Sequence, residues 1–291
     1  MSPCSRDLVI MNYRHHFHAG NFADVMKHSL LMGLLAALQK KDTPFCYLDT
    51  HAGAGVYDLH GTQAQKTGEY LQGIERLDDH RGAPPWVASY LQGVLARQAS
   101  GARSDYPGSP WLAVHALRPQ DRAILIDVQH AEVASLRHHF KNDARVAVHQ
   151  RNAYEGLTAL IPPKEKRGLA LIDPPYEIER DNYPQITKLI TAAHAKWPTG
   201  VYAIWFPIKQ RAPIVRFYRE LMNSGIPKLL TCELLMQPDD NALGLNGSGL
   251  LVVNPPWGFD TGARETLRWL NDRLSDHPQR SWNTRWLANI E

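Results

Sequence analysis

The alternation of short apolar runs with helical segments is the feature that most constrains the fold of this chain. Apolar runs at 123–127, 146–149 and 168–173 read as buried strands. The segments between them, 130–141 and 153–161, have the spacing of helices. Strands that alternate with helices at this spacing predict an α/β domain built on a mostly parallel sheet, with helices on both faces.

The flanking segments extend this pattern at both ends. Residues 21–40 predict a helix with an asparagine cap, and residues 44–55 predict a strand that runs into a glycine-containing turn. Further strands are expected at 200–206, 228–235 and 249–254. The last two are separated by a Gly- and Asn-rich loop too short for a helix, which favours antiparallel pairing. The total is about seven strands.

The chain divides where this alternation is interrupted. Its 291 residues suffice for one large α/β domain with an insertion, and no internal repeat is visible. Residues 1–10 are expected to be a disordered extension. Residues 57–110 are rich in Gly, Pro and Gln, show helical stretches but no convincing strand, and predict a helical insertion subdomain. The main domain then comprises 11–56 and 111–291.

Composition excludes several classes of protein. Hydrophobic residues make up 44% of the chain and charged residues 21%, as in ordinary folded proteins. The sequence predicts neither a secretory signal nor a membrane span, and Cys4, Cys46 and Cys232 are too far apart in sequence for a cysteine zinc motif. These features predict a cytoplasmic protein. The net charge of +3 permits contact with nucleic acid without demanding it.

Candidate ligand-binding residues follow the predicted strands. In open α/β sheets, ligands bind outside the carboxyl ends of the strands. Gly53 and Gly55 follow the first strand and could admit a ligand close to the backbone, although they could equally serve a tight turn. Asp127 ends the next strand and could accept hydrogen bonds from ribose hydroxyls, or it could merely cap a helix. A nucleoside-containing cofactor is therefore expected, but the glycine patterns for NAD and for ATP phosphates are both incomplete.

The sharpest chemical signal is Asp173-Pro174-Pro175-Tyr176, directly after an apolar strand. The exocyclic amine of adenine is a poor nucleophile because its lone pair is delocalised into the ring. A carboxylate and a main-chain carbonyl that accept its two hydrogens would make the nitrogen more reactive. The prolines carry no amide donor and fix φ, so the Pro174 carbonyl can be held toward the amine, while Tyr176 offers a ring to an unstacked base.

A second Pro-Pro turn competes for this role. Asn254-Pro255-Pro256-Trp257 also follows an apolar strand, and a Pro-Pro pair can be merely a rigid turn. Asp173 is expected in the middle of the sheet beside the cofactor turn, whereas Asn254 ends the last strand of the hairpin. This difference in position assigns the chemistry to Asp173 and a structural role to Asn254.

These motifs resemble those of a known family. Asp173-Pro174-Pro175-Tyr176 is similar to the catalytic motif of amino-group methyltransferases that use S-adenosylmethionine. More specifically, residues 13–28, 47–55, 106–110 and 171–176 resemble the ribosomal RNA large subunit methyltransferase J family, which methylates N6 of one adenine in bacterial 23S rRNA. The resemblance implies a Rossmann-like class I methyltransferase domain, S-adenosylmethionine as cofactor and 23S rRNA as partner. No membrane, metal or obligate protein partner is implied.

The resemblance also implies roles for individual residues. Asp173, Pro174 and Tyr176 would be catalytic, and Tyr13 would contact the substrate. Asp173 would also border the cofactor, whose other contacts would be His28, His51, Gly53, Ser109, Asp127, Asn152 and Ala153.

Several alternatives stay open from the sequence. The substrate could be a DNA adenine or another RNA, because the reacting base edge is the same. The chain could instead be a non-catalytic RNA-binding protein on this fold, or, less compatibly with its glycines, a nicotinamide-dependent dehydrogenase. His15, His16, His18 and His28 cluster in sequence, but no acidic or cysteine partner completes a zinc spacing, so proximity to an RNA phosphate is the favoured interpretation for the first three.

Overall fold

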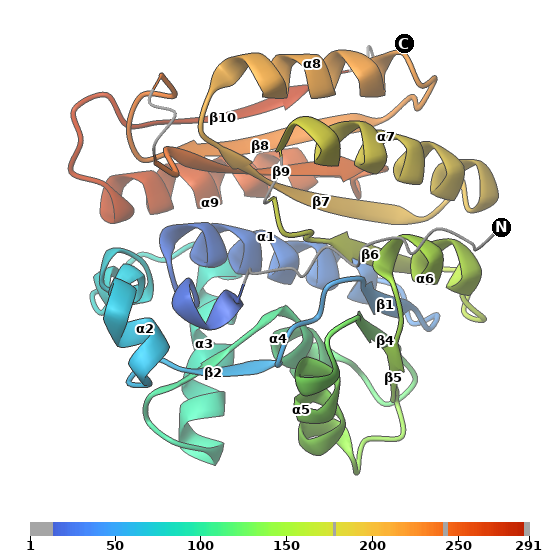
Figure 1. Ribbon diagram of the computed structural model, residues 1–291, viewed down its shortest axis with the longest axis horizontal. Helices are drawn as coiled ribbons and strands as arrows, with labels where there is room; N and C mark the ends of the chain where they lie inside the picture. The colour runs from blue at the N-terminus through green and yellow to red at the C-terminus, as the bar shows by residue number, and fades with distance from the viewer. Residues whose placement is uncertain (1–13, 177–178, 241–243, 288–291) are drawn as a thin grey trace, which may run out of the picture.

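The structure is a computed structural model of the whole chain, and it describes residues 14–176, 179–240 and 244–287 (Figure 1). The predicted extension 1–10 and the predicted substrate-binding Tyr13 lie outside the described residues.

A single large sheet organises the chain. It has eight strands in the order β10-β8-β9-β7-β6-β1-β4-β5. Five neighbouring strands, from β7 to β5 in this order, pair in parallel, and the remaining three pair antiparallel. The mostly parallel α/β sheet is therefore confirmed. The bounds are β1 Cys46–Asp49, β4 Arg122–Asp127, β5 Val146–Gln150, β6 Gly168–Ile172, β7 Val201–Ile208, β8 Leu229–Leu235, β9 Gly247–Val253 and β10 Ser281–Trp286.

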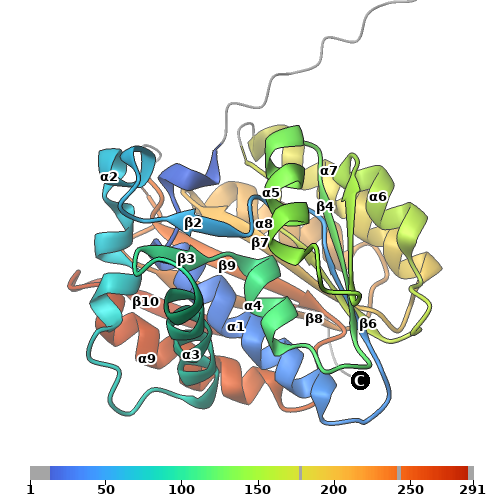
Figure 2. The same ribbon diagram turned by 90° about the horizontal axis from the view of Figure 1, so that it is seen from below.

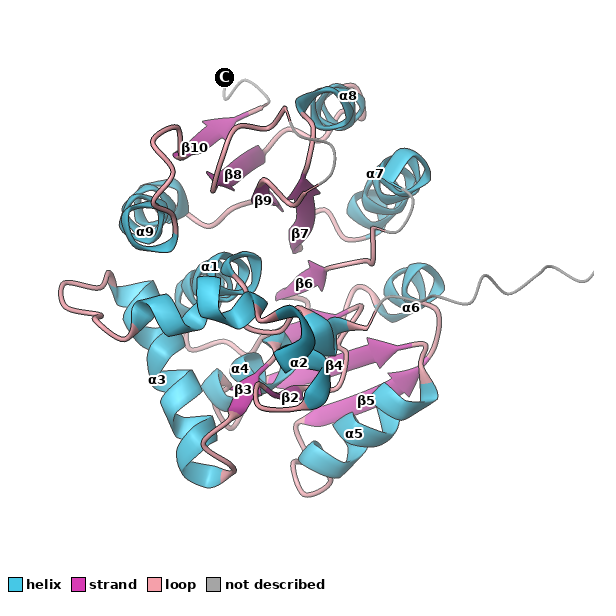
Figure 3. Ribbon diagram, turned by 60° about the vertical axis from the view of Figure 1, so that its left-hand side comes forward, coloured by secondary structure: helices cyan, strands magenta, loops and turns pink. Residues whose placement is uncertain are grey.

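Side chains alternate between two cores, as the two-residue period of a strand requires. In β1, Tyr47 belongs to the core on one face, and Cys46 and Leu48 belong to the core on the other. Figure 3 shows the helices on both sides of the sheet. The Tyr47 core includes side chains from α1 (Phe22–Gln39), α4 (Ser109–Ala116), α5 (His130–Phe140) and α9 (Phe259–Leu274), and the second core includes side chains from α6 (Ala153–Leu160), α7 (Glu179–Lys196) and α8 (Arg211–Met222).

The carboxyl-terminal strands confirm one prediction and correct another. β8 and β9 pair antiparallel as expected, and β9 is inserted between β7 and β8. The expected count of about seven strands was one too low, because β10 adds an edge strand beside β8. Its residues Ser281–Trp286 alternate between exposed and half-buried positions. This short polar edge strand has no apolar run that would mark it in the sequence.

The segment 57–110 is mainly helical but also carries strand structure. It contains α2 (Thr62–Thr67), the 3-10 turns η2 (Glu69–Gln72) and η3 (Ile74–Leu77), and α3 (Pro85–Ser100). The expectation that it has no strand was wrong, because β2 (Val56–Asp58) pairs antiparallel with β3 (Asp105–Pro107) at its two ends (Figure 2). This small ladder brings the two ends of the segment together, so the chain leaves the main domain and returns to it at one place.

Helix α3 packs directly on the main domain through Trp86. The indole ring stacks on Phe259 of α9, with ring centroids 4.9 Å apart. A Cβ added at Gly33 of α1 or at Gly262 of α9 would come within 2.3 Å and 2.4 Å of the indole. These two glycines let the ring lie flat between the helices, and Val87, Tyr90 and Val94 of α3 then join the Tyr47 core.

Candidate active site

Asp173 lies directly after β6, in the middle of the sheet, at the carboxyl edge of the parallel strands. Its Oδ2 accepts a hydrogen bond from Nζ of Lys27 at 2.5 Å. Its Oδ1 has no partner among the described residues. The side chain of Asp173 is 17% exposed, so one carboxylate oxygen is held from inside the protein and the other can meet a substrate.

Lys27 connects Asp173 to a buried acid on the same helix. Its Nζ also lies 2.9 Å from Oδ1 of Asp24, one turn earlier in α1. Burial opposes the charge of Lys27, but attraction to Asp173 and Asp24 outweighs burial and raises its pKa. The ammonium therefore remains charged between two carboxylates, and it fixes the orientation of Asp173 by a charge-assisted hydrogen bond.

Asp24 continues this network toward the N-terminal motif. Its Oδ2 accepts the backbone N–H of Gly20 at 3.0 Å and lies 2.9 Å from Nε2 of His15. Burial would raise the pKa of Asp24, but His15, Lys27 and His28 lower it well below its ordinary value. The chain His15, Asp24, Lys27, Asp173 thus joins η1 (His15–Phe17) to the end of β6.

The expectation that the clustered histidines face an RNA phosphate is only partly compatible with this arrangement. His15 faces Asp24, and His18 lies 2.8 Å from a carboxylate oxygen of Glu69 in the 57–110 segment. His15 and His16 both contact the ring of Tyr57 edge-on. His16 lies 4.0 Å from a carboxylate oxygen of Glu132. All three histidines therefore lie next to acidic groups of the protein, which leaves less of the motif for contact with phosphate.

The two prolines after Asp173 differ in how their carbonyls are used. The Pro175 carbonyl accepts a hydrogen bond from Nδ2 of Asn182 at 2.9 Å. None of the described residues donates to the carbonyl of Pro174. Directly after Asp173 there is thus a second acceptor to which no described residue donates, as the motif predicts for a site that binds an amine with two hydrogens.

Tyr176 is held in an aromatic cluster. Its ring is 8% exposed and meets the rings of Tyr183 and Trp205 at centroid distances of 5.4 and 5.7 Å. Its hydroxyl donates to the Trp205 carbonyl at 2.6 Å. Trp205 is half-buried, and its ring lies 5.8 Å from Nζ of Lys27. The aromatic surface near Asp173 is therefore formed by Tyr176 together with Trp205.

A second buried carboxylate, Asp49, ends β1 next to Asp173 in the sheet. Its Oδ2 accepts hydrogen bonds from the hydroxyls of Tyr47 at 2.6 Å and Ser109 at 2.7 Å. Burial raises the pKa of Asp49 to about 6, with a further contribution from the nearby charge of Asp173. The predicted cofactor residue Ser109 thus reaches the carboxyl edge of β1 through Asp49.

The turn after β1 is tied to the end of β4. Oδ2 of Asp127 accepts the N–H of Gly53 at 2.9 Å, and Oδ1 accepts the N–H of Gln129 at 2.8 Å. Gly53 and Gly55 adopt φ values of 59° and 83°, which other residues rarely adopt. Turn geometry alone therefore requires these glycines. Burial raises the pKa of Asp127.

The remaining predicted cofactor residues lie along the same edge. The half-buried ring of His51 is 6.4 Å from that of Tyr154, and burial lowers the pKa of His51 to about 4. Asn152 caps α6, since its side-chain oxygen accepts the N–H groups of Tyr154 and Glu155. Ala153, the first residue of α6, is buried.

His28 lies apart from this edge, inside the protein. Its Nδ1 is 3.0 Å from the Tyr106 hydroxyl, which in turn is 3.0 Å from the Tyr90 hydroxyl. Burial lowers the pKa of His28 to about 3, so the ring is neutral. This polar cluster fastens α1 to α3 and β3, and it reaches Lys27 only through Asp24, which lies 3.9 Å from Nε2 of His28.

The competing turn lies at the opposite edge of the sheet. Val253, the last residue of β9, pairs with Tyr202 near the start of β7. Because β9 runs antiparallel to β7, Asn254 follows at the amino edge of the parallel strands. Its Nδ2 donates to the carbonyls of Pro198 at 2.7 Å and Gly200 at 2.8 Å. Asn254 therefore has a structural role, as its position in the hairpin predicts.

Sequence reasoning missed Lys27, Asp24, Asp49 and Trp205. The available signal was the pair Asp24 and Lys27, two opposite charges three residues apart within a mostly apolar helix. Charged residues are rarely fully buried unless they are paired, so their presence on the buried side of α1 indicates a partner. The partner Asp173 lies 146 residues further along the chain and becomes visible only in the fold.

No group of three or more His, Cys, Asp or Glu side chains in the described ranges is arranged to hold a metal ion. In the same part of the chain, no helix combines the length and apolar character needed to span a bilayer.

One family model and two relatives match most of the length of this chain. The family model described as "Ribosomal RNA large subunit methyltransferase D, RlmJ" matches residues 42–288. The chain is 40% identical to ribosomal RNA large subunit methyltransferase J of Haemophilus influenzae over 280 residues, 96% of this chain and 99% of that protein. It is also 40% identical to the Escherichia coli protein of the same name, with coverages of 94% and 99%.

A solved structure matches at the level of the whole fold. The crystal structure of a Legionella pneumophila protein assigned to family DUF519 superposes with a TM-score of 0.84 and 35% sequence identity, over 92% of this chain and 98% of that one.

Proposed function

Because this chain belongs to the family of ribosomal RNA large subunit methyltransferase J, we propose that it transfers a methyl group to the N6 amine of one adenine in 23S rRNA. The observation that carries the proposal is a pair of acceptors at the end of β6 to which none of the described residues donates. Asp173 Oδ1 and the Pro174 carbonyl belong to adjacent residues, while Lys27 holds Oδ2.

In the proposed reaction, the target adenine leaves its base stack and presents N6 to these two acceptors. One hydrogen of N6 bonds to Oδ1 of Asp173 and the other to the Pro174 carbonyl. Both bonds favour a pyramidal nitrogen with an available lone pair. The base lies against Tyr176 and Trp205. Transfer leaves N6 with a surplus proton, which can pass through Oδ1 of Asp173 to solvent because this side chain is partly exposed.

The residues along the carboxyl edge fit S-adenosylmethionine as the methyl donor. When bound, it supplies an electrophilic methyl group on a sulfonium. Asp49, Asp127 and Asp173 end three adjacent strands, β1, β4 and β6, and three acidic groups suit a ligand with positive charge. In the proposed site, Asp127 binds the ribose, Asn152 and Ala153 border the adenine, and His51, Gly53 and Ser109 complete the wall. His28 supports this wall from inside.

The same geometry is compatible with an adenine in DNA or in another RNA, because the motif reads only the amine. The family favours rRNA, and methylation of rRNA would take place in the cytoplasm. The experiment that separates the substrates incubates the protein and radiolabelled S-adenosylmethionine with unmodified 23S rRNA, with 16S rRNA or with duplex DNA, and then digests each product to nucleosides. We expect N6-methyladenosine from 23S rRNA alone. Label in DNA or 16S rRNA would contradict the proposed substrate.

A further inference from the structure

A basic strip leads away from the proposed active site along the β5 edge of the sheet. The strip comprises residues 130–151, which form α5, the turn after it and β5. It contains four Lys or Arg, four His and two acidic residues, whereas Lys plus Arg and Asp plus Glu nearly balance over the whole chain at 32 and 29. The two acidic residues are Glu132 and Asp143. The strip thus holds a local excess of positive charge.

The positive charges of the strip are largely free of acidic partners. Arg145 pairs with Asp143 at 2.6 Å and also donates to the Leu117 carbonyl, so this pair fastens the turn to the end of α4. Arg137, Lys141 and Arg151 are exposed and have no acidic partner in the described part of the chain. Such a row of free cations matches a polyanion.

Burial and nearby positive charges lower the pKa values of two histidines of the strip. Burial lowers the pKa of His149, and the positive charges of Arg151 and Arg137 lower it further. Burial likewise lowers the pKa of His139, with further contributions from Arg97 and His138. An arriving anion would offset this repulsion.

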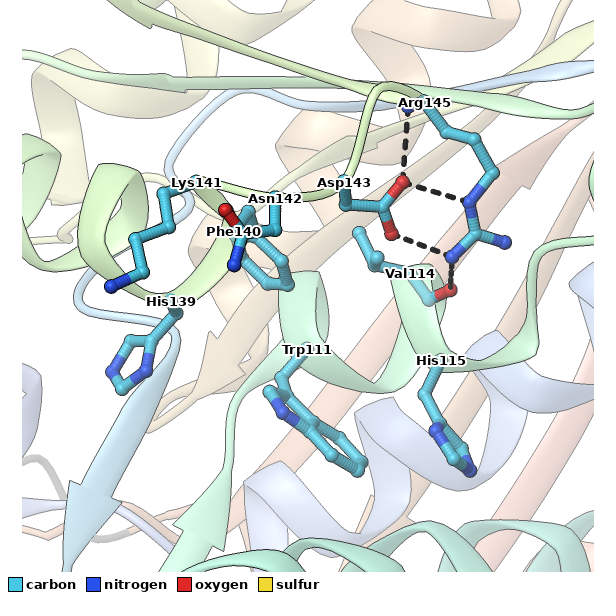
Figure 4. Close-up of a pocket in the computed structure, with 9 residues that line it drawn as sticks. All are labelled: Trp111, Val114, His115, His139, Phe140, Lys141, Asn142, Asp143 and Arg145. Atoms are coloured by element: carbon cyan, nitrogen blue, oxygen red, sulfur yellow. Dashed lines mark hydrogen bonds and ion pairs between the residues drawn. The ribbon is translucent and has the colours of Figure 1, made fainter.

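A hollow of about 440 Å³ lies at the far end of the strip, between α4 and the end of α5 (Figure 4). Its floor carries Trp111 and His115, whose rings stack at a centroid distance of 4.8 Å and an interplanar angle of 13°. Lys141, Asn142 and His139 border it from the α5 side. Figure 4 shows the rings of His139, Trp111 and His115 pointing to one side, away from the Asp143 and Arg145 pair.

This combination fits one nucleotide and its phosphate. A flat ring pair at the surface provides a stacking platform for an unstacked base, and an adjacent ammonium and amide provide donors to a phosphate. A second hollow of about 480 Å³ shares Lys141 and Asn142 and is also lined by Arg137. Lys141 therefore stands between two depressions, where it can contact the backbone of a strand that crosses both.

The position of the hollow suits the size of an RNA substrate. α5 begins next to the end of β4, which carries Asp127, and its 11 residues end at the hollow. An 11-residue helix is about 16 Å long, a distance that a few nucleotides of single-stranded RNA span. Asp173 follows β6, which β1 separates from β4, so about 10 Å of sheet adds to the length of α5. A strand of several nucleotides with one adenine at Asp173 can therefore reach the hollow along the strip.

We propose that the strip and the hollow form a second RNA-contact site, which binds a single-stranded segment of the rRNA substrate and stacks one of its bases on Trp111 and His115. The proposal rests on the proposed function, since it concerns the same RNA. It adds a contact remote from the reacting amine, one that would increase affinity for the substrate without touching the chemistry.

The test compares Lys141→Glu and His115→Ala with wild type, and Lys188→Glu serves as the control. Lys188 is an exposed lysine of α7, on the opposite face of the sheet. For each protein, KM for 23S rRNA, kcat, the salt dependence of rRNA binding and the affinity for S-adenosylmethionine are measured. His115 is exposed, so its truncation should not unfold the protein.

We expect Lys141→Glu and His115→Ala to raise KM for rRNA on the order of tenfold each, with kcat and donor affinity unchanged. Lys141→Glu should also reduce the slope of log affinity against log salt by about one. Lys188→Glu should match wild type. Wild-type KM and salt slope in both strip variants would overturn the proposal.

Two further outcomes keep this proposal separate from the proposed function. If wild type methylates no RNA but binds the donor, the proposed function fails, and direct rRNA binding by the strip variants still decides the second site. If the variants lose activity only on ribosomal particles and behave as wild type on naked 23S rRNA, the hollow contacts a ribosomal protein and the RNA proposal is wrong.

Discussion

Two turns of this protein share a sequence pattern and differ in almost everything else. Asp173-Pro174-Pro175-Tyr176 and Asn254-Pro255-Pro256-Trp257 each follow a buried strand. The first lies at the carboxyl edge of the parallel strands, where Asp173 contacts Lys27 of another element and has one oxygen that no described residue contacts. The second lies at the amino edge, where the Asn254 side chain donates two hydrogen bonds to nearby backbone carbonyls.

The difference shows that strand direction decides the role of such a motif. At the carboxyl edge, loops from several strands and the start of α1 converge, so a carboxylate there has neighbours able to orient it. At the amino edge, the hydrogen bonds of the Asn254 side chain within the described part of the chain go to backbone carbonyls, so they close the turn. The last residues of the two motifs also differ in burial, since Tyr176 is 8% exposed and Trp257 is 94% exposed.

Replacing Asp173 should give the largest effect and tests the functional half of the comparison. Asp173→Ala removes the acceptor for N6, and we expect kcat to fall on the order of a thousandfold. Donor affinity should stay within a few-fold, because Asp49 and Asp127 remain. Single-turnover methylation and calorimetric titration of the donor measure the two quantities. Substantial activity in this variant would move the chemistry elsewhere, with Asn254 the next candidate.

Lys27 is the neighbour that the other turn lacks, and its removal should cost somewhat less. Lys27→Met keeps the volume but leaves the buried Asp24 and the partly exposed Asp173 without their shared cation. We expect kcat to fall on the order of a hundredfold, and the free energy of unfolding to fall by about 3 kcal/mol. Denaturant unfolding and turnover measurements check both. Lys188→Met, on the surface of α7, is the matched control. Equal kcat and equal free energy of unfolding in the two variants would contradict a role for Lys27 in the site.

Replacing Asp49 tests whether a buried carboxylate at the carboxyl edge lowers the stability of the fold. Its pKa in the folded protein, about 6, lies above its ordinary value of 3.8, so its contribution to stability is full below pH 3.8 and is lost as pH rises through 6. We expect Asp49→Asn to gain stability relative to wild type between pH 4 and pH 8, by at most roughly 3 kcal/mol. Thermal unfolding of both proteins across this range measures the gain. A stability difference that does not change with pH would show that Asp49 does not titrate there.

The sequence allowed the central sheet and the end of β6 to be predicted, because local patterns specify both. Apolar runs mark buried strands, and Asp173-Pro174-Pro175-Tyr176 carries its chemistry within four adjacent residues. Lys27 could not be found in this way, since its role depends on a contact 146 residues away. β10 was missed for the opposite reason, because an edge strand half-exposed to water needs little apolar sequence.

Asn254 tests the structural half of the comparison and should affect stability alone. Asn254→Ala removes both side-chain hydrogen bonds and places a non-glycine residue without a polar side chain at φ 53°. We expect a loss of about 2 kcal/mol in the free energy of unfolding, with kcat unchanged. Asn254→Gly loses the same hydrogen bonds but tolerates the positive φ, so it should recover about 1 kcal/mol of this loss. Reduced turnover by the folded Asn254→Ala protein would contradict a purely structural turn.

Replacing Trp257 should have the smallest effect on stability and turnover, and it tests whether the amino edge contributes to substrate binding. With 94% of its surface exposed, its ring buries almost nothing in the folded chain. We expect Trp257→Ala to change the free energy of unfolding by no more than about 0.5 kcal/mol and to leave KM for 23S rRNA unchanged. The same unfolding and turnover measurements apply. The basic strip of residues 130–151 lies several strands away, at β5. A raised KM in Trp257→Ala would therefore show that the RNA also reaches the β9 end of the sheet. The two Pro-Pro turns would then differ in chemistry but not in contact with the substrate.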